Sequence, residues 1–312
     1  MDYTFASAFL SAKAATLLDR DQFLDIKKAD DDGFILRLQA LGYGIGAKGV
    51  DVEEIIAREI SLLKSELLFI LPDDALVVYF FHKYDLTNIR TYYKTRFFNL
   101  AKGPIERVGF LDERTLERAI IFGDCANVRE PYKTLFAAIE GKSFADPSEL
   151  SAYLQVTFQD IMYEDILARC DEPLMAYFVL STDIANLSTL LRARQFELEP
   201  FMLKSALLER GEMPIADILA LCDADSRAII ERYSRLYMSR FKKPLEQFFL
   251  GGGFASLEHA LLKVLLDELK PFQSDIRSSA SIISYVVSKQ IEMADVRRLY
   301  VDRSARIMAD SR

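Results

Sequence analysis

Three short patterns in this chain have residue types that could bind a phosphate or a metal ion. The first is a set of glycines at positions 44, 46 and 49, which match the spacing G-x-G-x-x-G. In dinucleotide-binding proteins that spacing follows a β-strand and opens a helix around a pyrophosphate. Residues 34–41 carry apolar side chains at helical spacing instead, so we expect a loop between helices. Lys48 follows alanine and precedes glycine, so the P-loop of an ATP-hydrolysing protein is absent.

The second pattern is acidic, at Asp30–Asp32 and Asp73–Asp74, and invites comparison with the aspartate-rich magnesium sites of all-α isoprenoid synthases. A third spaced acid would fall at position 34, which is Phe34. We therefore expect solvated turns and helix caps at both clusters. An all-α lyase or transferase that uses magnesium remains the catalytic alternative.

The third pattern is the pair of histidines, His82 and His259, which lie far apart without an H-E-x-x-H context. No nucleophile motif supports a Ser-His-Asp triad. The sequence thus predicts no catalytic residue, no cofactor and no metal ligand. The aromatic clusters at residues 79–81, 92–93 and 248–249 are candidates for the core, and some for a protein interface.

Composition narrows the class of protein further. The 312 residues are 51% apolar and 28% charged, with a net charge of −8. That charge opposes broad binding to nucleic acid or anionic lipid. Apolar runs such as residues 174–180 are far shorter than the roughly 20 residues of a spanning helix, so no membrane span is predicted. Three widely spaced cysteines and no visible export signal predict a cytoplasmic protein.

The elements that would position any site are helices. Apolar residues recur at helical spacing along most of the chain, and alternating strand-like runs are scarce, which predicts an all-α fold. Asp51 and Asp146 have the character of helix caps, the latter before Pro147 in a first turn. Residues 251–253 are three glycines and are expected to form a loop, with Ser256 capping the next helix.

An internal repeat organises these helices. Residues 85–96, 183–194 and 292–303 share an acid, then Asn or Asp, an aliphatic residue, a large apolar residue and Arg at offsets 0, 3, 4, 7 and 11. Such offsets trace one stripe on a helix. The polar positions of the three stripes are Asp85, Asn88 and Arg96; Asp183, Asn186 and Arg194; and Glu292, Asp295 and Arg303.

The helix starts expected at Asp51, Asp146 and Ser256 precede the three stripes by 34, 37 and 36 residues. We therefore predict three helical modules, at residues 1–105, 106–205 and 206–312. Within a stripe the acid and the Arg are about 16 Å apart along the axis, so each needs a partner elsewhere. The stripes are expected to fix the geometry of the modules or, alternatively, to contact another protein.

With these features the chain resembles a family of rotary-motor proteins, the C-type subunits of V-type (vacuolar/archaeal-type) ATPases, called d-type in eukaryotes. The likeness spans essentially the whole sequence. It includes the N-terminal helix around Tyr3 that leads to Leu17 and Leu18, the turn at residues 41–44, the segment 183–194 and the closing helix with Glu292. The third stripe departs from the family pattern with Asp295 and Val296 where Asn and Ile or Leu are typical.

The resemblance implies three similar bundles arranged with pseudo-threefold symmetry into a funnel. One mouth would receive the foot of the central shaft, formed by the D-type and F-type subunits, and the other face would sit on the membrane ring of proteolipid subunits. The protein would be non-catalytic, peripheral to the membrane, and would pass torque between ATP hydrolysis or synthesis and proton or sodium movement. The alternative is a helical scaffold or adaptor unrelated to rotary ATPases, whose repeats would form an open solenoid.

Overall fold

The computed structural model describes residues 2–29, 31–46 and 51–310, without the side chains of residues 31–32, 200 and 303–310. All regular elements in this part of the chain are helical, which confirms the predicted all-α class. The chain forms two compact units, Met1–Val77 with Lys270–Arg312, and Val78–Leu269. The division into modules at residues 1–105, 106–205 and 206–312 stays a prediction.

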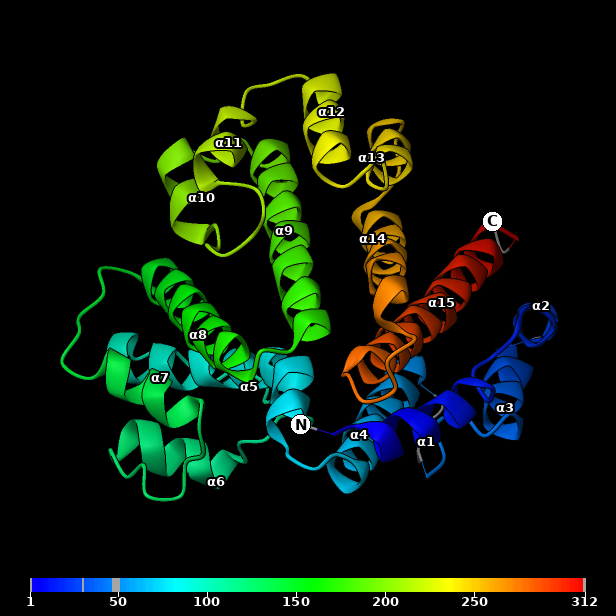
Figure 1. Cartoon of the computed structure of the whole chain (residues 1–312), viewed down its shortest axis with the longest axis horizontal. Coiled ribbons are helices and arrows are strands. Elements are labelled where there is room, and N and C mark those ends of the chain that lie inside the picture. Colours follow the sequence, from blue (N-terminus) through cyan, green and yellow to red (C-terminus); the bar gives the residue numbers. More distant parts are fainter. Residues whose placement is uncertain (1, 30, 47–50, 311–312) are drawn as a thin grey trace. The chain divides into compact units, whose positions relative to one another are not determined.

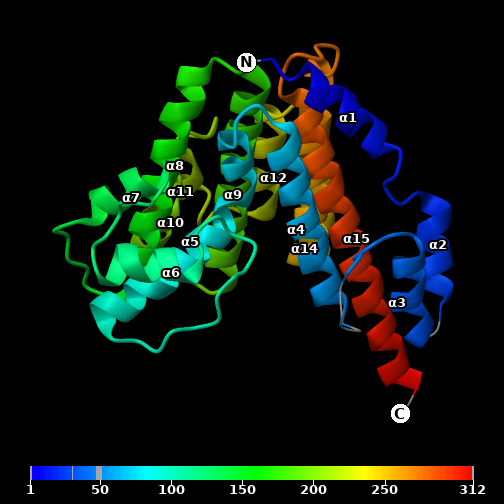
Figure 2. The ribbon, with the colours of Figure 1, turned by 90° about the horizontal axis from the view of Figure 1, so that it is seen from below.

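The first unit is built on two long helices that lie side by side, α4 and α15 (Figure 2). Helix α1 packs against α15, and α2 packs against both α3 and α15. Its buried core includes Ile26, Phe34, Leu38, Ile55 and Val296. The helices of this unit are α1 (Thr4–Ala14), α2 (Arg20–Lys28), α3 (Asp31–Ala40), α4 (Val52–Ile70), the 3-10 turn η2 (Lys270–Phe272) and α15 (Ala280–Asp310).

The second unit has α9 at its centre, packed on α8, α10, α11 and α14 (Figure 1). The helix α5 (Ala75–Phe98) enters this unit at Val78. The other elements are α6 (Glu113–Leu116), the π-helical turn η1 (Glu117–Ile121), α7 (Tyr132–Ile139), α8 (Pro147–Arg169), α9 (Glu172–Gln195), α10 (Pro200–Ala206), α11 (Ile215–Ala220), α12 (Ser226–Leu236), α13 (Lys242–Phe249) and α14 (Phe254–Leu269).

Side-chain caps begin several of these helices. Asp146 accepts hydrogen bonds from the amides of Ser148 and Glu149, with Pro147 in the first turn of α8, and Asp51 caps α4 through the Glu53 amide. Both caps were predicted. The predicted cap at Ser256 is wrong, because α14 already begins at Phe254 and Ser256 lies in its first turn. The preceding glycines form a tight turn in which the Gly252 amide bonds to the Gln247 carbonyl, so the helix starts directly after them.

One described helix, α9, is long and apolar enough by length and composition to cross a bilayer. Half of its most apolar stretch is buried inside the protein. It also carries the fully buried polar residues Asp183 and Asn186, whose hydrogen bonds are made within the protein. These are features of a central core helix.

His82 of α5 supplies a pH-dependent contribution to stability. Its ring stacks on Phe158 at 5.5 Å, and its Nδ1 lies 2.7 Å from the Tyr79 carbonyl oxygen. Burial, with smaller contributions from Lys83 and Arg90, lowers the pKa of His82 from 6.5 to about 3. The histidine is therefore neutral in the folded chain at pH 7, and its ring packs against Phe158.

We expect the unfolded chain to take up a proton at His82 as the pH falls below 6.5, while the folded chain does not. The stability contributed by this site is thus lost with decreasing pH, by up to about 1.4 kcal/mol per pH unit. In urea titrations between pH 7 and 5, the free energy of unfolding of His82→Leu should fall less steeply with decreasing pH than that of the parent chain. Equal slopes for the two proteins would contradict the assignment.

Candidate functional site

The first stripe holds a loop onto α5 through two buried side chains. Asp85 and Asn88 are both fully buried. Asp85 accepts hydrogen bonds from the Leu111 amide at 2.9 Å and the Tyr132 hydroxyl at 2.6 Å. Asn88 pairs in both directions with the backbone of Glu106, at 2.8 Å each. The loop at residues 106–111 is therefore fixed to α5, and we call this arrangement a clasp.

The second stripe makes the same clasp on α9. Asp183 accepts from the amides of Glu212, at 2.9 Å, and Met213, at 3.3 Å, and from the hydroxyl of Tyr237. Asn186 pairs in both directions with the backbone of Leu208, again at 2.8 Å each. In each clasp the acid therefore accepts from one tyrosine and from one or two backbone amides. The asparagine pairs with the backbone of one loop residue in both directions.

Two further features show that these loops are equivalent. Gly109 in the first loop and Gly211 in the second lie against the clasp carboxylate, and a Cβ atom at either position would overlap the acid's Oδ1. Only glycine leaves room for the acid there. In addition, Asn99 and Glu197 each stand 14 residues after the clasp acid, and both have φ of 52°. The repeat thus extends past the stripes into the loops.

The third stripe closes onto the N-terminal part of the chain with different chemistry. Glu292 is buried and accepts from the Leu18 amide at 3.2 Å. Lys289 pairs with Glu292 at 2.9 Å and with Glu59 at 2.7 Å, and its ammonium lies 4.4 Å from the centre of the Tyr43 ring. A lysine therefore bridges two acids here, whereas a tyrosine hydroxyl meets the acid in the other clasps.

Asp295 does not reproduce the role of Asn88 and Asn186. Its carboxylate pairs with Arg298 at 2.8 Å. A carboxylate has no N–H to donate, so it cannot make the two-way bond to one backbone residue that an asparagine makes. At position 295, where the family pattern has Asn, the Asp therefore lacks the two-way backbone bond that Asn88 and Asn186 make.

The arginines of the stripes lie in different surroundings. Arg96 is exposed, with its guanidinium 5.8 Å from the centre of the Phe97 ring. Arg194 is half-buried and donates to the carbonyls of Leu221, at 3.0 Å, and Ala224. The side chain of Arg303 lies outside the described residues. The acid and amide positions of the first two stripes share one contact pattern, and the arginine positions do not.

The pKa shifts of the clasp residues favour a positioning role over a catalytic one. Burial raises the pKa of Asp183 above its usual value, although the bonds from Tyr237 and two amides oppose the shift. Burial also raises the pKa of Tyr237 and of Tyr132, and the neighbouring acids add to it, so both hydroxyls stay protonated donors. The partners described above are backbone groups and phenols, an arrangement that can position a loop.

The glycine pattern that suggested phosphate binding follows a helix and not a β-strand. A helix, α3, precedes Gly44, whose amide donates to the buried Glu59 at 2.6 Å; residues 47–50 lie outside the described part. Asp73 accepts from the Ala75 amide and caps α5, as predicted, whereas Asp30 and the side chains of the next two residues are not described. Among the described residues, no group of three His, Cys, Asp or Glu is placed to hold a metal ion.

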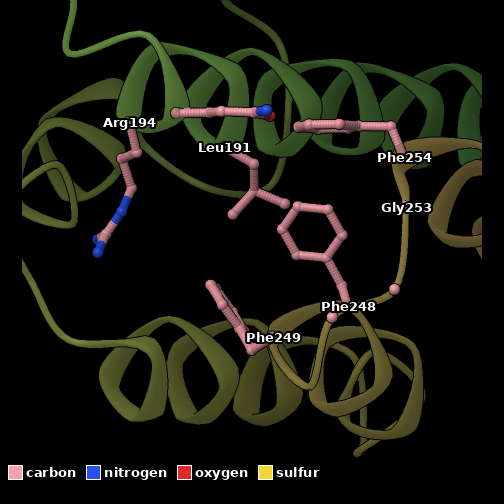
Figure 3. Close-up of a pocket in the computed structure, with 9 residues that line it drawn as sticks. Leu191, Arg194, Phe248, Phe249, Gly253 and Phe254 are labelled. Carbon is pink, nitrogen blue, oxygen red and sulfur yellow. The ribbon is translucent and has the colours of Figure 1, made fainter.

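A cavity of about 430 Å³ lies at the end of the second stripe (Figure 3). It is lined by Leu191, Arg194, Gln195, Phe248, Phe249, residues 251–253 and Phe254. The rings of Phe248 and Phe249 project into it from the end of α13, opposite Leu191 on α9. The phenylalanines are half-buried rather than core residues, whereas the clusters at residues 79–81 and 92–93 are buried, as predicted.

The fold and the clasps define an all-α protein in which one helical device recurs to lock successive segments of chain. A family model described as the ATP synthase (C/AC39) subunit matches residues 6–311, and the chain belongs to that family. It is a subunit of a V-type rotary ATPase, a complex in which this family is peripheral to the membrane. The alternative of a scaffold unrelated to rotary ATPases is therefore wrong. A comparison with curated protein sequences gives no match.

Proposed function

We propose that this subunit is the non-catalytic, cytoplasmic socket of the rotor. In this role it receives the foot of the central shaft, formed by the D-type and F-type subunits, on one side. It rests on the membrane ring of proteolipid subunits on the other. It turns with the rotor and transmits torque between ATP hydrolysis or synthesis and the movement of protons or sodium ions.

The observation that supports this role is the order in which the clasps join the chain. With the modules at residues 1–105, 106–205 and 206–312, Asp85 of the first holds the start of the second, at residues 106–111. Asp183 of the second holds the start of the third, at residues 208–213. Glu292 of the third holds Leu18, near the start of the first. A head-to-tail series whose last member returns to its first forms a ring when the rotation closes.

A closed ring of three bundles around a shared hollow suits a part that must turn without deforming. Close-packed helices transmit strain because protein interiors have low compressibility. Buried polar networks whose members are satisfied add rigidity and fix a single arrangement. The clasps combine both properties at the joints between the proposed modules, where a ring would otherwise flex. The same reasoning assigns the stripe acids and asparagines to the joints.

The test is reconstitution. The chain should be mixed with purified D-type and F-type shaft subunits, with the proteolipid ring in detergent, and with both, and each mixture analysed by size-exclusion chromatography. We expect one complex with each partner and a single complex that contains both. Elution of the chain apart from shaft and ring alike, at concentrations where it is folded, would refute the socket.

A further inference from the structure

The helices that carry the stripes, α5, α9 and α15, have basic side chains five or nine residues after the stripe acid. On α9 the arginine at offset 9, Arg192, pairs with Glu258 of α14 at 2.8 Å. On α15 the arginine at offset 5, Arg297, donates two hydrogen bonds to Glu53 of α4, at 2.6 and 2.7 Å. In both cases the guanidinium reaches an acid on a helix that is packed alongside.

On α5 both of these positions are basic, but neither meets an acid. Arg90 stands 5 residues and Lys94 9 residues after Asp85. The Arg90 guanidinium donates to the side-chain oxygen of Gln155 on α8, so a neutral amide occupies the place of the acid. Within the described part of the chain neither cation has an ion pair, and Nε of Arg90 is buried without a hydrogen-bond partner.

The acids of the two helices around Arg90 are engaged elsewhere. Asp85, the one acid of α5, is buried in the first clasp. The four acids of α8 have other partners, which are the Ala145 amide for Glu149, Arg210 for Asp160 and Glu164, and Arg169 for Asp165. Burial accordingly lowers the pKa of Arg90, and no carboxylate opposes the shift. A partly buried cation without a counter-charge is costly and calls for an explanation.

The two cations can be reached from outside the chain. Arg90 and Lys94 are half-buried, and because they are four residues apart they lie one turn apart on the same face of α5. Thr87 and Thr91 lie on this face as well, and their hydroxyls donate to backbone carbonyls one turn earlier. The face therefore offers two cations and neutral hydroxyl groups to a group from another molecule.

The chemistry of a guanidinium indicates what that group is. Its planar fork matches a carboxylate or a phosphate with two parallel hydrogen bonds. The net charge of −8 opposes approach to an anionic lipid surface, which disfavours a lipid phosphate. The chain belongs to a family of ATPase subunits, so protein carboxylates of neighbouring subunits are available in the complex. An acidic side chain of a neighbouring protein is therefore the favoured partner.

We propose that Arg90 is an anchor for a carboxylate of a neighbouring subunit of the ATPase, with Lys94 as a second contact one turn away. The partner then supplies on α5 the acid that Glu258 supplies to α9 and Glu53 supplies to α15. Arginine is among the residues that dominate the binding energy of protein interfaces. The proposal rests on membership of the rotary complex and holds whether or not the subunit is the socket.

The first test is a cross-link in the assembled ATPase. Arg90→Lys keeps the charge and introduces a primary amine, which a carbodiimide couples to a carboxylate in contact with it. We expect mass spectrometry to find position 90 joined to an Asp or Glu of another subunit. The parent complex is the control, because a guanidinium does not couple. Cross-links from position 90 to acids of this chain alone, or no cross-link at all, would overturn the anchor.

The second test supplies the acid from within the chain. Gln155→Glu places a carboxylate on the group that Arg90 already contacts. We expect the urea midpoint of the isolated chain to rise, and its affinity for the cross-linked subunit to fall about tenfold because the guanidinium is occupied. The matched control is Gln247→Glu, which adds the same charge at an exposed position of α13 and should change neither quantity.

Arg90→Met separates an interface role from a structural one. Because the cation has no acid within the described chain, its removal should leave the urea midpoint unchanged or higher, while the affinity for the cross-linked subunit falls about tenfold. A lower midpoint with unchanged affinity would show that Arg90 serves the fold alone. Unchanged affinity in both Arg90→Met and Gln155→Glu would overturn the anchor and leave the socket untouched.

Discussion

Replacing Asp183 by Asn is expected to destabilise the second unit by about 2–4 kcal/mol, although the two side chains have nearly the same shape. The carboxylate accepts from two backbone amides and one phenol in a fully buried site. An amide group offers one oxygen to these donors and sets its own N–H bonds against the rest. The neutral side chain avoids the cost of burying a charge, but the donors left without an acceptor outweigh that gain.

Urea unfolding measures the global loss, and amide hydrogen exchange at Glu212 and Met213 measures the local one. We expect exchange at these two amides to accelerate by about thirtyfold or more. The control is Asp160→Asn on α8, which removes an exposed carboxylate that pairs with Arg210 at 3.3 Å; it should change stability by less than about 0.5 kcal/mol. Similar effects of Asp183→Asn and Asp160→Asn would show that the clasp does not stabilise the second unit.

Replacing Lys289 by Met should cost about 3–5 kcal/mol, because removing one partner of a buried ion pair leaves its charge uncompensated. Lys289 bridges Glu59 and Glu292, whose side chains are only 8% and 5% exposed. Since Glu292 also holds the Leu18 amide, hydrogen exchange in α2 should accelerate together with the loss of global stability. The matched control is Lys13→Met, which breaks an ion pair with Glu66 at the more exposed surface of the same unit, and should cost less than about 1 kcal/mol.

The stability of Lys289→Met should also depend on pH in a way that a simple packing defect would not produce. Burial already raises the pKa of Glu292, and Lys289 is the largest influence that lowers it. Without the lysine the pKa rises further, so the folded chain binds a proton that the unfolded chain does not. Stability then increases as the pH falls, and the deficit relative to the parent chain should shrink between pH 8 and 5. A deficit that is constant over this range would contradict the ionic bridge.

The helices and the clasp acids could be predicted from sequence because both leave periodic traces. Apolar spacing of 3.6 residues predicts helices, and the three stripes place Asp85, Asp183 and Glu292 at the same register of their helices. Asp146 and Asp51 are recognisable as caps because the helix start itself demands an acceptor for its free amides.

The partners of the clasps could not be predicted in the same way. The Leu111 and Met213 amides are backbone groups that any residue offers, so no side-chain type marks them. The loop residues paired with Asn88 and Asn186 stand 18 and 22 residues after them, and this difference in spacing hides the equivalence. Gly109 and Gly211 are the one recurrent signal, and their meaning depends on a close approach that only coordinates reveal.

Ser256 and the glycines before it show the other limit. A serine near an expected helix start is a reasonable cap, but the tight turn at residues 251–253 lets α14 begin earlier. That same turn leaves the cavity beside Phe248 and Phe249, two residues expected mainly in the core. Three consecutive glycines indicate a loop, whereas the cavity beside them depends on how α9, α13 and the turn pack together.

The most direct test of the ring of three modules is an experimental structure of the protein in which α5, α9 and α15 are superposed together with the segments they hold. The proposed socket predicts that each superposition is a rotation of about one third of a turn around one common axis. Rotations about unrelated axes, or a steady translation along one axis as in an open solenoid, would contradict it.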